Sequence, residues 1–116
     1  MSTPDTIYRG VKTATGFAVT ANGKPLSPAA SQKIAFHADG FSWGYSGSGT
    51  LQLAIALLFD AIRDVAAARR WVRWYNWLGP VNWGDEWETT GCEIREAIAA
   101  LDIFEAPPLV VNGGVA

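Results

Sequence analysis

The chain has 116 residues and a net charge of −2, which suits a single domain and argues against binding nucleic acid by bulk charge. Its hydrophobic content of 49%, with six tryptophans, predicts a globular fold and excludes an intrinsically disordered chain. The single cysteine, Cys92, excludes an internal disulfide, and the lack of a signal-peptide pattern at the start favours a cytoplasmic protein.

The first third of the chain is predicted to be mainly β-structure. Three segments alternate apolar and polar side chains as half-buried strands do: residues 6–12, 17–21 and 33–37. Asn22-Gly23 is the strongest short hairpin signal, and Pro25 restricts the returning residues 24–26 to an edge position. The connector that follows can form one helical turn, with Ser27 as its cap and Pro28 at its first position.

The most apolar stretch of the chain, residues 51–62, follows a glycine-rich turn at residues 43–50. A helix that is apolar on most of its circumference must be covered on several sides, so this stretch predicts the core helix. We expect the helix to run to about Val65, where alanines allow either continuation or a small bend. It is too short to span a bilayer, which needs about 20 apolar residues.

The glycine turn has two interpretations. With Ser48 or Gly49 as the N-cap, free N–H groups at the helix start can hold a phosphate, a carboxylate or a nucleotide. The candidate anion-binding residues are therefore Gly47, Ser48, Gly49 and Thr50. Alternatively, the glycines only allow Trp43 and Tyr45 to fold back over the start of the helix. No lysine follows the glycines, which excludes a Walker A phosphate loop.

Residues 69–78 predict another helix, ended by Gly79-Pro80. Four of its apolar side chains recur at helical spacing and are expected to be buried together: Trp71, Trp74, Tyr75 and Leu78. Arg70, Arg73 and Trp77 lie on a different face, where Arg73 and Trp77 are spaced for a cation–π contact. An exposed tryptophan beside arginines is typical of an interface hot spot, and packing of Trp77 in the core is the alternative.

The last third of the chain predicts one strand and one helix. Residues 86–89 alternate, which places Trp87 inward and both glutamates outward. Thr90 and Glu93 then have the spacing of a capping box. The helix that follows carries an apolar face for the core.

We expect regular structure to end at Glu105, just before Pro107-Pro108. The predicted domain therefore covers residues 1–104, and residues 105–116 are expected to form a loose tail. The predicted fold class is α+β, with a small antiparallel sheet packed on the central apolar helix and on the C-terminal helix.

The sequence offers little for catalysis or metal binding. One histidine, His37, and one cysteine cannot complete the usual zinc site. A Ser–His–Asp set from Ser46 or Ser48 with His37 and Asp39 lacks the glycine-flanked serine of a nucleophile elbow. The short acidic run at residues 85–88 is more typical of a solvated edge than of a cation site. We therefore expect a protein that is not an enzyme, with no metal site and no cofactor.

A binding function has more support. Four of the arginines fall within residues 63–73 and seven of the eleven acids follow residue 84, so a basic segment precedes an acidic one. The two segments either neutralise each other or face a partner. The candidate partner-binding residues are Arg70, Arg73, Trp77, Asp85 and Glu86. The negative overall charge favours a protein partner over direct contact with nucleic acid.

The central motif resembles a known family. Trp43-Gly44-Tyr45-x-Gly47-Ser48-Gly49, followed by Gln52-Leu53-Ala54-x-Ala56-Leu57-Leu58, resembles a family of small uncharacterised proteins from bacteria and their phages, classed only as a domain of unknown function. The likeness covers about residues 7–101 and includes His37 and residues 87–90. The chain departs from the family pattern at Ser46, where glycine is usual, and at Thr50, where proline is usual.

The resemblance implies no activity, but the occurrence of the family on mobile elements implies a role. Small phage accessory proteins without catalytic residues often bind and block host defence machinery. We therefore expect a non-enzymatic phage or mobile-element protein that is located in the host cytoplasm. It is expected to bind a host protein or ribonucleoprotein complex and to inhibit a defence complex such as a CRISPR effector. The alternative is a small-ligand or nucleotide-binding protein that uses the glycine turn at the helix N-terminus.

Overall fold

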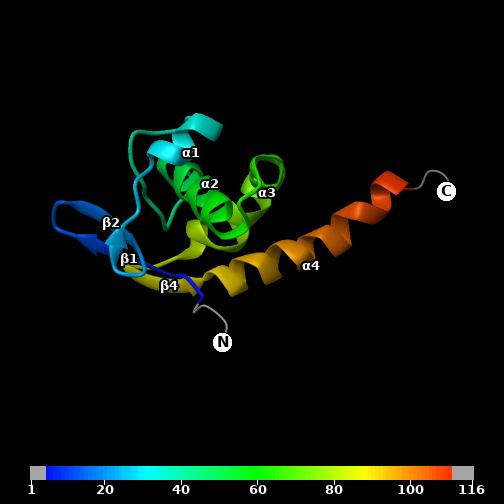
Figure 1. Ribbon diagram of the computed structural model, residues 1–116. Helices are drawn as coiled ribbons and strands as arrows, with labels where there is room; N and C mark the ends of the chain where they lie inside the picture. Colours follow the sequence, from blue (N-terminus) through cyan, green and yellow to red (C-terminus); the bar gives the residue numbers. More distant parts are fainter. Residues whose placement is uncertain (1–4, 111–116) are drawn as a thin grey trace.

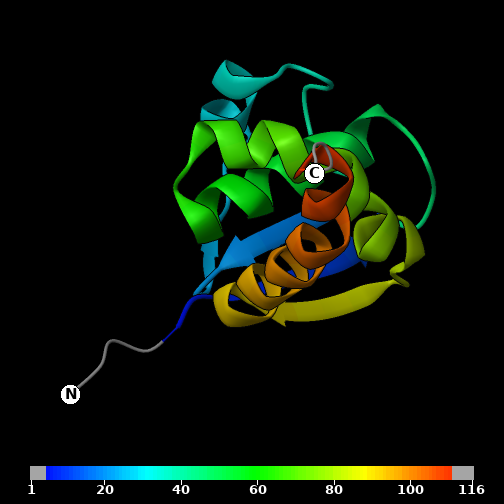
Figure 2. The ribbon, with the colours of Figure 1, turned by 90° about the vertical axis from the view of Figure 1, so that its right-hand side faces the viewer.

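The computed structural model describes the backbone of residues 5–110 and the side chains of residues 5–102. The fold is α+β, as predicted, with a four-stranded antiparallel sheet of order β3-β2-β1-β4 (Figures 1 and 2). The strands are β1 Ile7–Thr13, β2 Gly16–Ala21, β3 Lys24–Pro25 and β4 Glu86–Thr90. The helices are α1 Ala29–Ile34, α2 Ser48–Ile62, α3 Val65–Leu78, the short 3-10 helix η1 Pro80–Asn82, and α4 Gly91–Val110.

The predicted hairpin and its edge strand are confirmed. Asn22 and Gly23 both have positive φ, 52° and 82°, as a two-residue turn between twisted strands requires. The Asn22 side chain also accepts a hydrogen bond from the backbone N–H of Ile7, at 2.8 Å. The short β3, which contains Pro25, lies at one edge of the sheet.

The strand predicted at residues 33–37 is wrong. Its first two residues end α1, and the rest form a loop before α2. The reason is the buried side chain of Gln52, whose Oε1 accepts hydrogen bonds from the backbone N–H groups of His37 at 2.6 Å and Ala38 at 3.0 Å. A core side chain therefore satisfies the donors that a neighbouring strand would otherwise take.

Helix α2 is the core helix that the sequence predicts, and Leu53 to Leu58 are all buried. It ends at Ile62, three residues before the predicted Val65, because Arg63 adopts a left-handed conformation with φ 61°. Asp64 then caps α3 by accepting a hydrogen bond from the N–H of Ala67, at 3.1 Å. The chain therefore turns sharply, and α3 packs back against α2.

Aromatic side chains fill the space between the sheet and the helices. The indole of Trp87 stacks on Trp83 with ring centroids 4.1 Å apart and meets Trp43 edge to face at 5.5 Å. The Trp87 ring also lies against Gly10 on β1, where a Cβ atom would come within 2.2 Å of the indole. Trp87 faces inward and Glu86 and Glu88 face outward, so this part of the strand prediction is confirmed.

Helix α3 buries a narrower face than the sequence predicts. Trp71 and Tyr75 are buried, but Trp74 and Leu78 are exposed. The buried stripe starts at Ala68 and follows the contacts of α3 with α2, α4 and η1, which cover only part of its circumference. The predicted end of α3 at Gly79 is confirmed.

Helix α4 begins with the predicted capping box. The Thr90 hydroxyl accepts from the N–H of Glu93, and the Glu93 carboxylate accepts from the N–H of Thr90, both at 3.1 Å. The helix continues to Val110, past the proline pair where we expected regular structure to end, and its second half extends away from the body (Figures 1 and 2). Proline removes hydrogen bonds from a helix, but its fixed φ is itself helical. The rest of the predicted tail, residues 111–116, lies outside the described residues.

Candidate interaction surface

The outward side of α3 carries exposed apolar side chains next to arginines. Trp74, Trp77 and Leu78 expose 48%, 64% and 58% of their surface. Arg70 and Arg73 are exposed on the same helix. We call these five residues the tryptophan–arginine face. The predicted exposure of Arg70, Arg73 and Trp77 is confirmed, and core packing of Trp77 is excluded.

The two arginines of this face differ in their contacts. The guanidinium of Arg70 lies over the ring of Trp71, 4.7 Å from its centroid, and 3.9 Å from the carboxylate of Asp102 on α4. Arg73 has no carboxylate within 4 Å among the described side chains. Its predicted cation–π contact with Trp77 is also not among the cation–π pairs of the described residues.

Two hydrogen bonds join the end of α3 to the residues that follow it. The side chain of Asn82 in η1 donates to the carbonyl oxygen of Trp77, at 2.5 Å, and the N–H of Gly79 donates to that of Tyr75, at 2.9 Å. These bonds satisfy carbonyl groups that a helix end leaves free. The exposure of Trp77 is therefore a property of an ordered helix end rather than of a loop.

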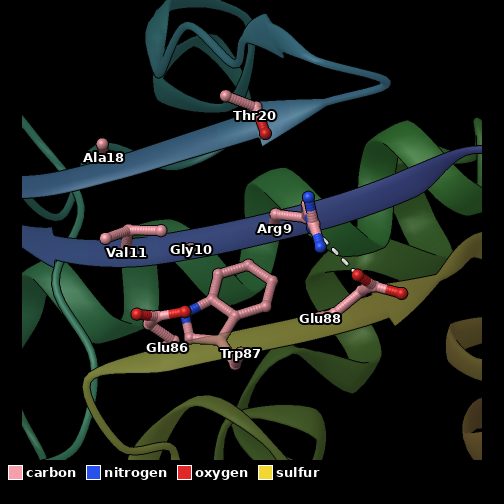
Figure 3. Close-up of a pocket in the computed structure, with 8 residues that line it drawn as sticks. All are labelled: Arg9, Gly10, Val11, Ala18, Thr20, Glu86, Trp87 and Glu88. Carbon is pink, nitrogen blue, oxygen red and sulfur yellow. Dashed lines mark hydrogen bonds and ion pairs between the residues drawn. The ribbon is translucent and has the colours of Figure 1, made fainter.

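The acidic candidates lie on the sheet, not on α3. Asp85 directly precedes β4, and its carbonyl oxygen accepts from the N–H of Lys12, at 2.8 Å. Glu86 begins β4 and its side chain lies on the open face of the sheet (Figure 3). On the same face Glu88 pairs with Arg9, with 2.9 Å between Oε1 and Nε (Figure 3). Arg9 and Glu88 line a groove of about 490 Å³ together with Gly10 and Trp87 (Figure 3).

The candidate anion-binding residues surround the start of α2. Gly47 is the N-cap, with extended φ of −176°, rather than Ser48 or Gly49 as predicted. Thr50 is fully buried, and its hydroxyl donates to the carbonyl oxygen of Tyr45, at 2.8 Å. A Cβ on Gly49 would lie 2.4 Å from the Ser42 hydroxyl oxygen, so this glycine permits close packing.

These contacts favour the interpretation that the turn folds back over the helix start. The positive φ in the turn belongs to Gly44, at 85°, and a Cβ there would lie 2.8 Å from the carbonyl oxygen of Trp83. Ser48 is exposed and Gly47 is half-buried. Binding of an anion at Gly47, Ser48, Gly49 and Thr50 stays a prediction.

Three groups outside the interaction surface have raised pKa values. The hydroxyl of Tyr8 donates to the carboxylate of Asp60 at 2.5 Å, and burial together with this carboxylate raises the pKa of Tyr8. Burial also raises the pKa of Tyr75. The exposed thiol of Cys92 has its pKa raised mainly by the charge of Glu96, which lowers its reactivity. Among the described residues no cluster of acidic, histidine or cysteine side chains is arranged to hold a metal ion.

A sequence comparison decides the family. The model of a family of unknown function, DUF6166, matches residues 8–100. The chain belongs to this family. The DUF6166 match includes the sheet, α1 to α3 and the first half of α4. No curated protein and no solved structure matches the chain significantly. In the described part of the chain no helix has both the length and the apolar character needed to cross a membrane.

Trp74 and Leu78 are surface residues, although their spacing predicts burial. Trp74 lies four positions after Arg70, so the two share a helix face, and that spacing was a signal for exposure. Nothing comparable marked Leu78, which lies near Tyr75 on the helix and is exposed as the last residue of α3. The apolar content of the surface is therefore larger than predicted.

Proposed function

We propose that this DUF6166 protein is a binding protein and that the tryptophan–arginine face contacts its partner. The observation that carries the proposal is the exposure of Trp74 and Trp77 on an ordered helix, in a chain that buries Trp43, Trp71 and Trp87. Tryptophan and arginine are the residue types that are enriched at interface hot spots. Covering an exposed indole removes apolar area from water, at about 25 cal/mol per Å².

The partner that we propose is a host protein or ribonucleoprotein complex, and the proposed effect is inhibition of a defence complex such as a CRISPR effector. The support for this role is the resemblance of the central motif to proteins from bacteria and their phages. A second support is Arg73, which suits an acidic side chain or a phosphate group because no described carboxylate is within 4 Å of it. The role requires no catalytic residue.

An infection assay tests this proposal. Bacteria with an active CRISPR effector are infected with a targeted phage, with and without expression of the chain. Expression should raise the number of plaques, and Trp77→Ala should remove most of this effect. Phe36→Ala is the matched control, because Phe36 is an aromatic residue with 63% exposure outside α3. An unchanged plaque count with the wild-type chain would refute inhibition of that effector.

A binding measurement with the purified complex tests the surface itself. Trp77→Ala should weaken binding about 30-fold, the equivalent of the roughly 2 kcal/mol of a hot-spot tryptophan. Because the Trp77 side chain is largely exposed, its loss should leave the unfolding temperature nearly unchanged. Equal weakening by Phe36→Ala would show that the tryptophan–arginine face is not the contact surface.

A further inference from the structure

Strand β4 is the last strand of the sheet and has a free edge. Its neighbour on one side is β1, and no described strand pairs with its other side (Figure 2). An exposed edge presents unpaired backbone N–H and C=O groups, and an extended segment of another protein can add to such an edge. Only those backbone N–H and C=O groups of β4 that do not bond to β1 are available for such an addition.

The register between β4 and β1 determines which backbone groups of β4 point away from β1. The N–H of Lys12 donates to the carbonyl oxygen of Asp85 at 2.8 Å, and the N–H of Gly91 donates to that of Thr6 at 3.0 Å. In an antiparallel pair hydrogen-bonded positions alternate with non-bonded ones, so Trp87 also exchanges hydrogen bonds with β1. The intervening residues Glu86 and Glu88 therefore direct their backbone N–H and C=O groups away from β1.

The third outward position, Thr90, is already occupied, because its N–H donates to the Glu93 carboxylate at 3.1 Å. This bond closes the edge at the start of α4. The open stretch of the edge therefore consists of Glu86 and Glu88, two residues at hydrogen-bonding spacing for one added strand.

The charge at this edge is negative. Asp85, Glu86 and Glu88 are all exposed, and within the described residues the only one of them in an ion pair is Glu88, with Arg9. A second β4 would place like charges opposite one another, which opposes pairing between two copies of this chain. A segment with positive side chains would gain from the same carboxylates.

A hollow of about 290 Å³ adjoins the edge at the end of α3. Its lining is mixed: Leu78, Trp83 and Ala97 contribute apolar atoms, and Glu88, Thr89 and Glu93 contribute polar ones. In an added strand, the residue opposite Glu88 would direct its side chain to the open face, and the next residue would direct its side chain to the opposite face, where the hollow lies. The carboxylates on both sides of the edge therefore favour positive side chains on the added strand, and the apolar atoms of the hollow can contact the side chain that follows.

We propose that the free edge of β4 binds an extended, positively charged segment of a protein partner as an added strand. Its positive side chains lie beside Glu86 and Glu88, and the side chain that follows the one beside Glu88 faces the hollow at Leu78. The site shares Leu78 with the tryptophan–arginine face, but its backbone groups and carboxylates do not involve Trp74 or Trp77. It goes beyond the proposed function, and substitution of Trp77 or of Glu88 tests the two proposals separately.

The test uses a synthetic peptide of alternating lysine and valine, with a peptide of alternating glutamate and valine as the control. Amide hydrogen exchange is followed by NMR. In the free protein the amides of Trp87 and Thr89 should exchange slowly and those of Glu86 and Glu88 fast, because only the former bond to β1. Saturation with the lysine peptide should protect Glu86 and Glu88. Absence of that protection, or equal protection by the glutamate peptide, would overturn the proposal.

Two substitutions separate strand addition from simple charge attraction. Glu88→Pro removes an outward N–H without removing a bond to β1, so it should weaken peptide binding about tenfold or more. Glu88→Gln keeps the N–H and should weaken binding by about fivefold at most, as for an exposed ion pair. Equal affinity of the two variants would overturn the proposal.

Further variants control for folding and for the other surface. Glu86→Pro tests the same edge at the first position of the strand, where proline is best tolerated, and the unfolding midpoint shows whether each variant is folded. If neither proline variant folds, the exchange pattern of the wild-type chain decides the outcome. Trp77→Ala should bind the peptide as the wild type does, and a tenfold loss there would overturn the assignment to the edge.

Discussion

Replacing Gln52 with leucine should destabilise the fold by about 3 kcal/mol. The Gln52 side chain is fully buried on α2 and makes four hydrogen bonds. Its Oε1 accepts from the backbone N–H groups of His37 and Ala38, and its Nε2 donates to the Ser31 hydroxyl at 2.9 Å and to the Ala35 carbonyl at 3.2 Å. Leucine has a similar volume but can make none of these bonds.

The magnitude follows from the groups that lose a partner. A buried donor or acceptor without a partner costs about 1–3 kcal/mol. His37 and Ala38 are half-buried, so water can reach them in part, and each N–H should contribute about 1 kcal/mol. Ser31 keeps its bond to the carbonyl oxygen of Pro28, so the Ala35 carbonyl supplies the remaining part of about 1 kcal/mol.

Thermal and urea unfolding measure this loss. For a chain of this size, about 3 kcal/mol corresponds to a decrease of about 12 °C in the unfolding temperature. The matched control is Gln32→Leu, because Gln32 makes one such bond, to the Ala38 carbonyl at 2.9 Å. That variant should lose about 1 kcal/mol. If the Gln52→Leu protein were as stable as Gln32→Leu, the hydrogen bonds of Gln52 would not be what holds the loop at residues 35–38.

Three more substitutions test other contacts. Gly10→Ala should lower the free energy of unfolding by about 1–3 kcal/mol, because the new Cβ forces the Trp87 indole to move. Gly40→Ala, where a Cβ meets open space, should lower it much less. Urea unfolding compares the two variants. Thr90→Ala removes the cap of α4 and should cost about 1 kcal/mol in the same measurement. The N–H of Cys92 and the charge of Arg95 lower the pKa of Asp5. The contribution of the Asp5 carboxylate to the free energy of unfolding is therefore present above the usual aspartate pKa and is lost as pH falls through the lowered value. The urea midpoints of wild type and Asp5→Asn should converge in acid.

Elements whose signals lie within a few neighbouring residues could be predicted from the sequence. The Asn22-Gly23 turn, the inward position of Trp87 and the capping box of Thr90 with Glu93 each depend on residues a few positions apart. Their backbone conformations and hydrogen bonds are set within one turn or one strand, so a sequence pattern suffices to predict them.

Features that depend on contacts between distant segments could not be predicted in this way. Residues 33–37 alternate like a strand, but the N–H groups of His37 and of the following Ala38 donate to Gln52 and are not free to pair with a strand. The spacing of Trp74 from Arg70 was a signal that it lies towards the polar face, but its exposure is decided by the narrow stripe that the neighbours of α3 cover. The open edge at Glu86 and Glu88 likewise arises from the order of strands in the sheet, which is fixed by long-range packing.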